Sequence, residues 1–344
     1  MVNPAGPPEG RRLDVVLTDP ILNRYAEVLS GNGTDGHRWS FVSGADPATQ
    51  LAAVRGAQVL VAASMTDAMA SAAARLELVQ VTGAGYDKIP IDRLAPNIAV
   101  ANTFRHGRSI AEWVLMSTVL LSRDVLRSDA AFRSGTWRSV LTDASVPLRP
   151  TVQQLIFGLI GLGETGAEVA RLVKAFGARG QAVRARPEAP LPAGVELDWV
   201  GGIDQLDHLL ATSDVVVVTV PLNEATRGLI GAAQYALMKP DALLINVARG
   251  AVLDEDATFA ALSAGTIGGA ALDVWWGHPR DPSGAPPSRH DFAALPNVLL
   301  TPHHAGHTDD TFRRRAQDIA ANLAALAIGA PLHNLVRAPN LARD

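Results

Sequence analysis

The sequence contains no cysteine, which excludes disulfide bonds, cysteine nucleophiles and thiolate metal sites. Aromatic residues make up only 5% of the chain, and no apolar run approaches the length that would span a bilayer. A formal charge of −4 gives no broad basic surface of the kind that nucleic acid or an anionic membrane requires. We therefore expect neither nucleic acid nor membrane as a partner, and predict no metal site.

The composition is that of a globular protein, with 48% hydrophobic and 19% charged residues, and 344 residues suit two domains. Residues 1–12 are rich in proline and glycine and lack the apolar segment of a signal peptide, which predicts a disordered tail. These features favour a cytoplasmic enzyme or binding protein.

A glycine-rich turn stands between two segments of clear periodicity. An apolar run at residues 155–160 predicts a buried strand, and a helical pattern begins at residue 167. The first glycine of such a turn makes the tight bend, the second admits a pyrophosphate, and the third lets the helix pack on the strand. With 30 glycines the pattern arises by chance in roughly one such chain in five, so the strand and helix around it carry the prediction. We expect the dinucleotide to bind at Gly161, Leu162, Gly163, Glu164, Thr165 and Gly166.

Before this turn, strands and helices alternate and predict a small parallel α/β domain. Its strands are expected at residues 13–18, 39–42, 59–63, 78–82 and 98–101, with a helix at residues 68–76. The fourth strand ends at Gly83, Ala84 and Gly85, where backbone N–H groups could hold a carboxylate. The alternative is a plain tight turn.

Arg105, His106 and Arg108 precede a predicted long helix over residues 109–132. Ser109 and Glu112 have the spacing of a capping box at its start. Apolar side chains cover most of the helix, which predicts burial between domains or at a subunit contact. The basic cluster is commonly a solvated loop, and the sharper interpretation is an electropositive rim for an anionic substrate.

The second domain continues with further apolar strands and a closing helix. The strands are expected at residues 214–220, 242–247, 267–272 and 298–301, and the helix at residues 308–328. Because this helix is expected to return to the first domain, we predict a first domain of residues 13–107 and 305–337 and a second of residues 108–304.

Four short segments follow the predicted strands of the second domain and should meet at one edge of its sheet. They are residues 220–223, 246–250, 272–276 and 301–306. Arg249 offers a planar fork and a cation that would polarise a carbonyl. His303 offers a proton that titrates near neutral pH. Each alone would more commonly be a surface ion pair or a structural histidine.

As a set, these motifs resemble those of the D-isomer-specific 2-hydroxyacid dehydrogenase family. The resemblance covers residues 60–310 and rests on the glycine turn, residues 226–230, the 246–250 block, residues 270–274 and residues 301–303, in the family's order. It implies two doubly wound parallel α/β domains, a Rossmann cofactor domain and a flavodoxin-like substrate domain, with the active site in the cleft.

The resemblance also implies roles for single residues. Arg249 would bind the substrate and His303 would be the acid/base, while Gly83 to Gly85 would cradle the carboxylate, with Arg105 and His106 nearby. The expected cofactor contacts beyond the turn are Val220, Pro221, Thr226, Val247, Ala248 and Asp273. Family members are similar in being homodimers, which would give the apolar helix near 109–132 a use.

Two positions depart from the family pattern. Where the family usually has a glutamate that raises the pKa of the catalytic histidine, this chain has His278. A neutral imidazole can orient His303 but cannot stabilise its protonated form as a carboxylate does. The formate dehydrogenases of the same superfamily also lack that glutamate, and hydride abstraction from formate needs no proton transfer.

The second departure concerns the cofactor. An acidic residue is expected about 20 residues past the turn, on the ribose 2′-hydroxyl. The chain has Arg184 there and Arg186 two residues on, and a guanidinium favours a 2′-phosphate. We therefore predict NADP over NAD. The strand at residues 180–184 is weak by propensity, and another register would move the arginines away.

The leading prediction is NAD(P)-dependent reduction of a small 2-keto acid, such as glyoxylate or hydroxypyruvate, to its D-2-hydroxy acid. Arg249 and the backbone of Ala84 and Gly85 would hold the carboxylate, and protonated His303 would deliver the proton. The alternatives are formate-type oxidation and a dinucleotide-sensing protein with little catalysis. Trp275 and Trp276 could be pocket or core, and the loop at 277–290 could cover the cleft or lie on the surface.

Overall fold

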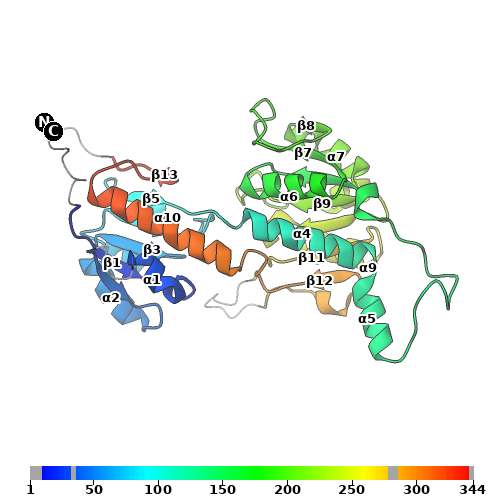
Figure 1. Ribbon diagram of the computed structural model, residues 1–344, viewed down its shortest axis with the longest axis horizontal. Helices are drawn as coiled ribbons and strands as arrows, with labels where there is room; N and C mark the ends of the chain where they lie inside the picture. The colour runs from blue at the N-terminus through cyan, green and yellow to red at the C-terminus, as the bar shows by residue number, and fades with distance from the viewer. Residues whose placement is uncertain (1–9, 32–35, 278–285, 341–344) are drawn as a thin grey trace, which may run out of the picture. The chain divides into compact units, whose positions relative to one another are not determined.

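The computed structural model describes residues 10–31, 36–277 and 286–340. Its backbone forms two compact units (Figure 1). Unit 1 comprises residues 1–105 and 308–344, and unit 2 comprises residues 106–307. The chain therefore enters unit 1, forms all of unit 2, and returns to unit 1 through its last long helix.

Unit 1 is built on a six-stranded sheet with the order β13-β5-β4-β3-β1-β2. Five strands are parallel, and β13 pairs antiparallel to β5. The parallel order β2-β1-β3-β4-β5 is that of a flavodoxin-like doubly wound sheet, as predicted. The strands are β1 (Asp14–Leu17), β2 (Arg38–Phe41), β3 (Val59–Ala62), β4 (Leu78–Val81), β5 (Ala99–Ala101) and β13 (Leu335–Arg337).

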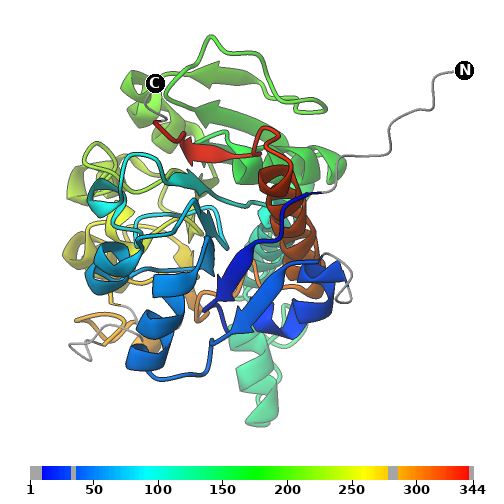
Figure 2. The ribbon, with the colours of Figure 1, turned by 90° about the vertical axis from the view of Figure 1, so that its left-hand side faces the viewer.

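Helices cover both faces of the unit 1 sheet, with α1 (Ala26–Leu29) and α10 (Asp309–Ala327) on one side and α2 (Pro47–Gly56) and α3 (Asp67–Ala72) on the other. α10 buries Phe312, Ala316, Ile319 and Leu323 against that sheet, at the spacing of one helical face. Figure 2 shows α10 in orange-red running beside the blue strands of unit 1.

Unit 2 is a seven-stranded, fully parallel sheet with the order β12-β11-β10-β9-β6-β7-β8. Read from β8, this is the Rossmann order with one further strand, which confirms the predicted fold class. The strands are β6 (Ile156–Ile160), β7 (Arg179–Val183), β8 (Trp199–Gly201), β9 (Val215–Val218), β10 (Leu243–Asn246), β11 (Gly269–Leu272) and β12 (Val298–Leu300). The helices are α4 (Gly107–Ser122), α5 (Val125–Arg133), α6 (Glu164–Ala175), α7 (Leu206–Thr212), α8 (Ala232–Leu237) and α9 (Glu255–Ser263).

The second strand of unit 2, which is weak by propensity, is present in the structure as β7. β7 pairs with β6 along its whole length, from Ile156 opposite Arg179 to Ile160 opposite Val183. The strand is buried after its first residue, so its register is fixed by burial although its propensity is weak. Arg184 is therefore the first residue after the strand, next to the end of β6.

The predicted helix at 109–132 differs from the structure in two ways. It begins earlier, at Gly107 in α4, and Ser109 donates to the carbonyl of His106, so the predicted capping box is wrong. It is also two helices, because Asp124 adopts a left-handed conformation with φ +53° and ends the run. The carboxylate of Asp124 pairs with Arg138, and α5 starts directly after it.

The apolar face of α4 packs into the core of unit 2. Ile110, Ala111, Trp113, Val114 and Leu115 join one hydrophobic cluster with side chains of α6 and the central strands. α5, by contrast, has no buried residue. The burial predicted for this segment is therefore found in its first half, within unit 2 itself.

Residues 1–9 of the predicted tail lie outside the described residues. Arg11 donates its N–H to the carbonyl of Ala327 at 3.1 Å, and its guanidinium pairs with Glu77. Unit 1 thus includes contacts from before the predicted boundary at residue 13. Within the described ranges, no helix is both long and apolar enough to cross a bilayer, and no cluster of three metal-binding side chains occurs.

Candidate active site

The glycine turn of unit 2 follows β6 and leads into α6. Gly161 has a φ of +101°, which favours glycine, and a Cβ at Gly166 would lie under 3.0 Å from the carbonyl oxygen of Gly161. A Cβ at Gly163 would meet nothing within 4 Å. The first and third glycines are therefore required by the protein's own packing, whereas the second leaves an opening beside the backbone.

That opening fits the pyrophosphate of a dinucleotide. The side chain of Leu162 is buried in the core, so the turn presents backbone rather than side chain at this point. α6 begins at Glu164 and has 12 residues, which directs a helix N-terminus and its N–H groups toward the turn. Thr165 lies in the same first helical turn. These residues can hold a phosphate group through backbone donors alone.

The segment after β9 lies beside the glycine turn. Thr219 donates its hydroxyl to the carbonyl of Gly161 at 2.9 Å, and a Cβ at Gly161 would lie 3.0 Å from Val220. Thr226 in turn donates its hydroxyl to the carbonyl of Pro221 at 2.6 Å, which fixes the shape of this loop. The predicted cofactor residues Val220, Pro221 and Thr226 therefore form one connected segment at the same sheet edge.

Arg184 stands at the end of β7, as the fixed register requires. Its N–H donates to the carbonyl of Gly201 at 3.0 Å. Its guanidinium turns back on the following loop and donates to the carbonyl oxygens of Pro187, Ala189 and Pro190. Arg186 is exposed two residues on.

The turn after β10 is shaped by Asn246, a fully buried side chain. Its amide oxygen accepts from the N–H of Ala248 at 3.0 Å, and its amide nitrogen donates to the carbonyl of Arg249 at 3.0 Å. Arg249 is half-buried and donates to the carbonyl of Ala248. Gly250 packs so tightly on the backbone of Trp275 that a Cβ would lie under 3.0 Å from it. The Arg249 turn therefore lies directly against the turn that follows β11.

Asp273 follows β11 and organises the turn that carries His303. Its buried carboxylate accepts from the hydroxyl of Thr301 at 2.6 Å, and from the N–H groups of His304 at 2.9 Å and Ala305 at 3.0 Å. His303 has a φ of +57°, an uncommon backbone conformation that a histidine adopts only where its surroundings hold it. Asp273 thus holds the turn of the predicted acid/base through a side-chain hydroxyl before His303 and two backbone N–H groups after it.

The neighbours of His303 add to this arrangement. Its ring lies nearly parallel to that of His307, with 6.2 Å between centroids and 7° between planes. The indole N–H of Trp275 donates to the carbonyl of Thr301 at 2.9 Å. Trp275 and Trp276 both pack against the hydrophobic core of unit 2, so of the two fates weighed for the tryptophans these contacts match the core.

His278 lies outside the described residues, so its predicted role is not addressed by the structure. The described end of the same loop is held to α9. Glu255 accepts hydrogen bonds from Ser288 and Arg289, and the base of the loop closes through a bond from Gly277 N–H to the carbonyl of Pro287. Burial raises the pKa of Glu255, but these hydrogen bonds outweigh it, and its pKa lies below the ordinary value.

The glycine-rich turn of unit 1 follows β4 and is partly exposed. Asn102 donates its side-chain amide to the carbonyl of Ala84 at 2.8 Å, and the N–H of Thr103 donates to the carbonyl of Gly83. Within the described part of the chain, the N–H groups of Gly83, Ala84 and Gly85 donate no hydrogen bond to the protein. The carbonyls of Gly83 and Ala84 accept hydrogen bonds, whereas the N–H groups of the turn remain available to an anionic ligand.

The structure separates the predicted basic rim into different surroundings. Arg105, in unit 1, makes two hydrogen bonds to Asp318 of α10, at 2.8 and 2.9 Å. Arg108 pairs with Glu112 on its own helix. His106 caps α4, and its Nδ1 lies 4.0 Å from a carboxylate oxygen of Glu164. Arg105 and Arg108 are therefore each paired with a carboxylate of their own unit.

Two residues at these turns were given no role of their own from the sequence. Asn246 shapes the Arg249 turn, and its only sequence signal is a polar residue that ends an otherwise apolar strand. Arg315 of α10 lies near Gly83, where a Cβ would be 3.9 Å from its Nη1. Nothing in the local sequence distinguishes Arg315 from Arg313 and Arg314, because the contact depends on how α10 packs on unit 1.

A Rossmann sheet, a glycine turn open at its second glycine, and an arginine and a histidine after two strands on either side of β11 define a nicotinamide-dependent oxidoreductase. The profile of the D-isomer specific 2-hydroxyacid dehydrogenase NAD binding domain matches residues 115–305. The chain belongs to that family, and it is an NAD(P)-dependent enzyme that interconverts a 2-keto acid and its D-2-hydroxy acid.

Individual relatives agree with this placement. The chain is 33% identical over 272 residues to a glyoxylate reductase of Aeropyrum pernix, covering 77% of this chain and 78% of the relative. It is 28% identical to a D-3-phosphoglycerate dehydrogenase of Methanocaldococcus jannaschii over 96% of this chain but only 60% of the relative. An NADPH-dependent glyoxylate/hydroxypyruvate reductase from Sinorhizobium meliloti, solved in complex with NADP and sulfate, has a TM-score of 0.77 at 25% identity, covering 94% of this chain and 98% of that one.

Proposed function

We propose that the protein reduces a small 2-keto acid, of the size of glyoxylate or hydroxypyruvate, with NADPH as the preferred cofactor. The observation that carries the proposal is the set of three hydrogen bonds that the carboxylate of Asp273 accepts from the His303 turn. Burying a carboxylate costs free energy, and a histidine with a purely structural role does not require it. Such a carboxylate is well suited to hold an acid/base in one orientation.

Each residue has a chemical task in this proposal. The nicotinamide, when bound, supplies the hydride to the carbonyl carbon. Arg249 polarises the carbonyl, and the backbone N–H groups of Gly83 to Gly85 hold the carboxylate. Protonated His303 donates its proton to the carbonyl oxygen as that oxygen gains charge. Asp273 contacts neither substrate nor proton and positions the turn.

The test is NADPH-dependent turnover on a panel of 2-keto acids, with His303→Ala beside the wild type. We expect the wild type to reduce glyoxylate or hydroxypyruvate and the variant to lose at least about a hundredfold in kcat, the usual contribution of a positioned acid. Unchanged turnover in His303→Ala would remove it as the acid. Formate-dependent production of NADPH, or tight cofactor binding with no turnover, would favour one of the two alternatives instead.

The NADP preference rests on Arg184 and Arg186. The guanidinium of Arg184 already lies at the end of β7 and bonds to neutral carbonyl oxygens, which a 2′-phosphate would replace with stronger charge-assisted bonds. We expect Arg184→Ala to lower the kcat/KM ratio of NADPH to NADH by about tenfold or more. Arg179→Ala, at the other end of the same strand and paired with Asp198, is the control and should leave the ratio unchanged. A wild-type preference for NADH that persists in Arg184→Ala would end this proposal.

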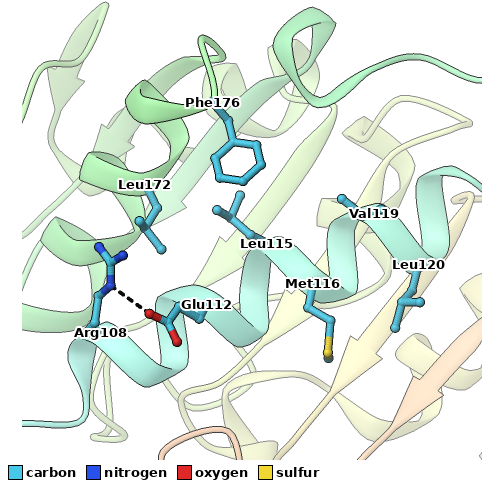
Figure 3. Close-up of a pocket in the computed structure, with 8 residues that line it drawn as sticks. All are labelled: Arg108, Glu112, Leu115, Met116, Val119, Leu120, Leu172 and Phe176. Carbon is cyan, nitrogen blue, oxygen red and sulfur yellow. Dashed lines mark hydrogen bonds and ion pairs between the residues drawn. The ribbon is translucent and has the colours of Figure 1, made fainter.

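A homodimer is proposed through the outer face of α4. An open groove of about 410 Å³ between α4 and α6 has mostly apolar walls (Figure 3). Its lining residues are Arg108, Glu112, Leu115, Met116, Val119, Leu120, Leu172 and Phe176. Phe132 of α5 and Trp137, which follow α4 in the chain, are further large apolar residues with exposed fractions of 62% and 63%. A second copy related by a two-fold axis would cover this face on both chains.

Sedimentation or light scattering on the purified protein tests the dimer. We expect the mass of two chains for the wild type and of one chain for Met116→Asp, because Met116 is 44% exposed and an aspartate there can keep its contact with solvent in the monomer. Phe41→Asp, a 39% exposed apolar residue of unit 1, is the matched control and should remain a dimer. A monomeric wild type at micromolar concentration would contradict the proposal. The cytoplasmic location remains a prediction from the sequence.

A further inference from the structure

α10 brings an arginine to the glycine-rich turn of unit 1. Arg315 is partly buried in the second turn of this helix, and its Nε donates to the carbonyl oxygen of Phe104 at 2.7 Å. Its guanidinium carbon lies 5.4 Å from the centre of the Phe312 ring. A Cβ at Gly83 would lie 3.9 Å from its Nη1. The contacts with Phe104 and Phe312 hold the guanidinium in place, with its Nη1 beside Gly83.

Arg315 belongs to a run of three arginines whose other members face elsewhere. Arg313 pairs with Asp309 and Arg314 with Asp310, both one turn back on the exposed surface of the same helix. The packing of α10 therefore selects one arginine of the run for the turn. The two others are close matches in sequence and helix position that do not reach it.

The turn itself is prepared for a negative charge. Its N–H groups donate to nothing in the described parts of the protein, as noted above. The carboxylate of Asp19, which reaches the base of the turn, is already committed to the hydroxyl of Thr82 and the N–H groups of Ile21 and Leu22. A carboxylate placed on the turn would thus find backbone donors and, alongside, a guanidinium suited to bidentate recognition.

We propose that Arg315 binds the carboxylate of the substrate together with the N–H groups of the Gly83 turn. The inference rests on the proposed reduction of 2-keto acids and adds a specificity-determining residue on unit 1 to Arg249 on unit 2. Because Arg315 contacts the carboxylate in the ground state and the transition state alike, its loss affects substrate binding more than the chemical step.

The first experiment compares Arg315→Gln with Arg314→Gln in steady-state reduction of glyoxylate by NADPH. We expect the KM for glyoxylate to rise at least tenfold in Arg315→Gln, with kcat within about twofold of the wild type, and no change in Arg314→Gln. Arg315→Lys keeps the charge but loses the fork, and its KM should rise by about three- to tenfold. If Arg315→Gln does not fold, Arg315→Lys becomes the test of the proposal. An unchanged KM for glyoxylate in Arg315→Lys would overturn it.

Titration calorimetry with oxalate on the NADPH-loaded protein gives a readout that does not require turnover. We expect the Kd for oxalate to be at least tenfold weaker in Arg315→Gln than in Arg314→Gln. If this difference is found but the wild type reduces no keto acid, the proposed function fails and the assignment of Arg315 stands. If the wild type reduces glyoxylate while the two variants share one KM and one oxalate Kd, Arg315 is not the anion-binding residue. Absence of oxalate binding to the wild type would also overturn the assignment.

Discussion

Two glycine-rich turns follow buried strands in this protein, and they are held in different ways. In unit 2, Gly161 requires a positive φ and Gly166 has no room for a Cβ, so the backbone of the turn fits only glycine at both positions. In unit 1, Gly83 has a φ outside the positive range and only the end of one flexible side chain near it. The first turn is shaped by its own backbone, whereas the second is shaped by side chains from distant parts of the chain.

This difference explains why the sequence predicts the cofactor turn from a clear motif but gives no comparable motif for the unit 1 turn. A steric requirement for glycine leaves a fixed spacing, which is visible in any single sequence. The support of the second turn comes from Asn102, Asp19 and Arg315, which lie far from Gly83 along the chain. Such support leaves no local pattern. The contrast makes predictions for substitutions in each turn.

The largest effect is expected from Gly166→Ala. The added Cβ would collide with the carbonyl of Gly161, a backbone atom that cannot move without displacing α6 from β6. Overpacking of this kind costs about 1–3 kcal/mol or more, equivalent to a loss of roughly 2–10 °C in Tm for a domain of this size. Thermal unfolding without cofactor measures it. A Tm within 1 °C of the wild type would show that the turn can accept a methyl group at residue 166, against the close contact with the Gly161 carbonyl.

Gly163→Ala should separate cofactor binding from folding. Its Cβ meets no protein atom within 4 Å, so we expect the Tm of the cofactor-free protein to change little. The methyl group would occupy the space proposed for the pyrophosphate, and the Kd for NADPH should rise at least about tenfold, a free-energy loss near 1.4 kcal/mol. Fluorescence titration with NADPH tests this. An unchanged Kd would place the pyrophosphate elsewhere.

Much of the fold could be predicted because buried strands and helix faces appear in the sequence as apolar runs and apolar stripes. The run of valines in β9 is fully buried on both faces, and the stripe on α10 is the stripe that packs on unit 1. The break at Asp124 could not be predicted, because a left-handed aspartate is held there by an arginine 14 residues later. The earlier start of α4 likewise has no local pattern, since Gly107 packs closely on Glu164 and Glu168 of α6, more than 50 residues later.

The candidate site was predictable where it follows strand ends and not where it depends on packing between elements. Arg249, Asp273 and His303 each follow an apolar strand within three residues, so their shared edge follows from a parallel sheet. The hydrogen bonds from Asp273 to the His303 turn could not be foreseen, because they depend on the relative stagger of β11 and β12. The pairing of Arg105 with Asp318 likewise depends on where α10 returns to unit 1.

An intermediate effect is expected from Asn102→Ala in unit 1. The substitution removes the hydrogen bond to the carbonyl of Ala84 and leaves that carbonyl to solvent or a water. A hydrogen bond of this kind is worth about 0.5–1.5 kcal/mol. We expect the KM for glyoxylate to rise about three- to tenfold with kcat and the Kd for NADPH unchanged. If the Kd for NADPH changed instead and the KM did not, the Gly83 turn would have no part in binding substrate.

The smallest effect is expected from Gly83→Ala, which is the direct counterpart of Gly166→Ala. Its Cβ would lie 3.9 Å from Nη1 of Arg315, an ordinary contact distance, and its φ needs no glycine. We expect a Tm within about 1 °C of the wild type, because a Gly-to-Ala change at a compatible backbone position is neutral or slightly stabilising. The KM for glyoxylate should stay within about threefold, since the N–H groups of the turn are retained. If Gly83→Ala lowered the Tm as far as Gly166→Ala, the unit 1 turn would be as sterically constrained as the cofactor turn, and distant side chains could not be what shapes it.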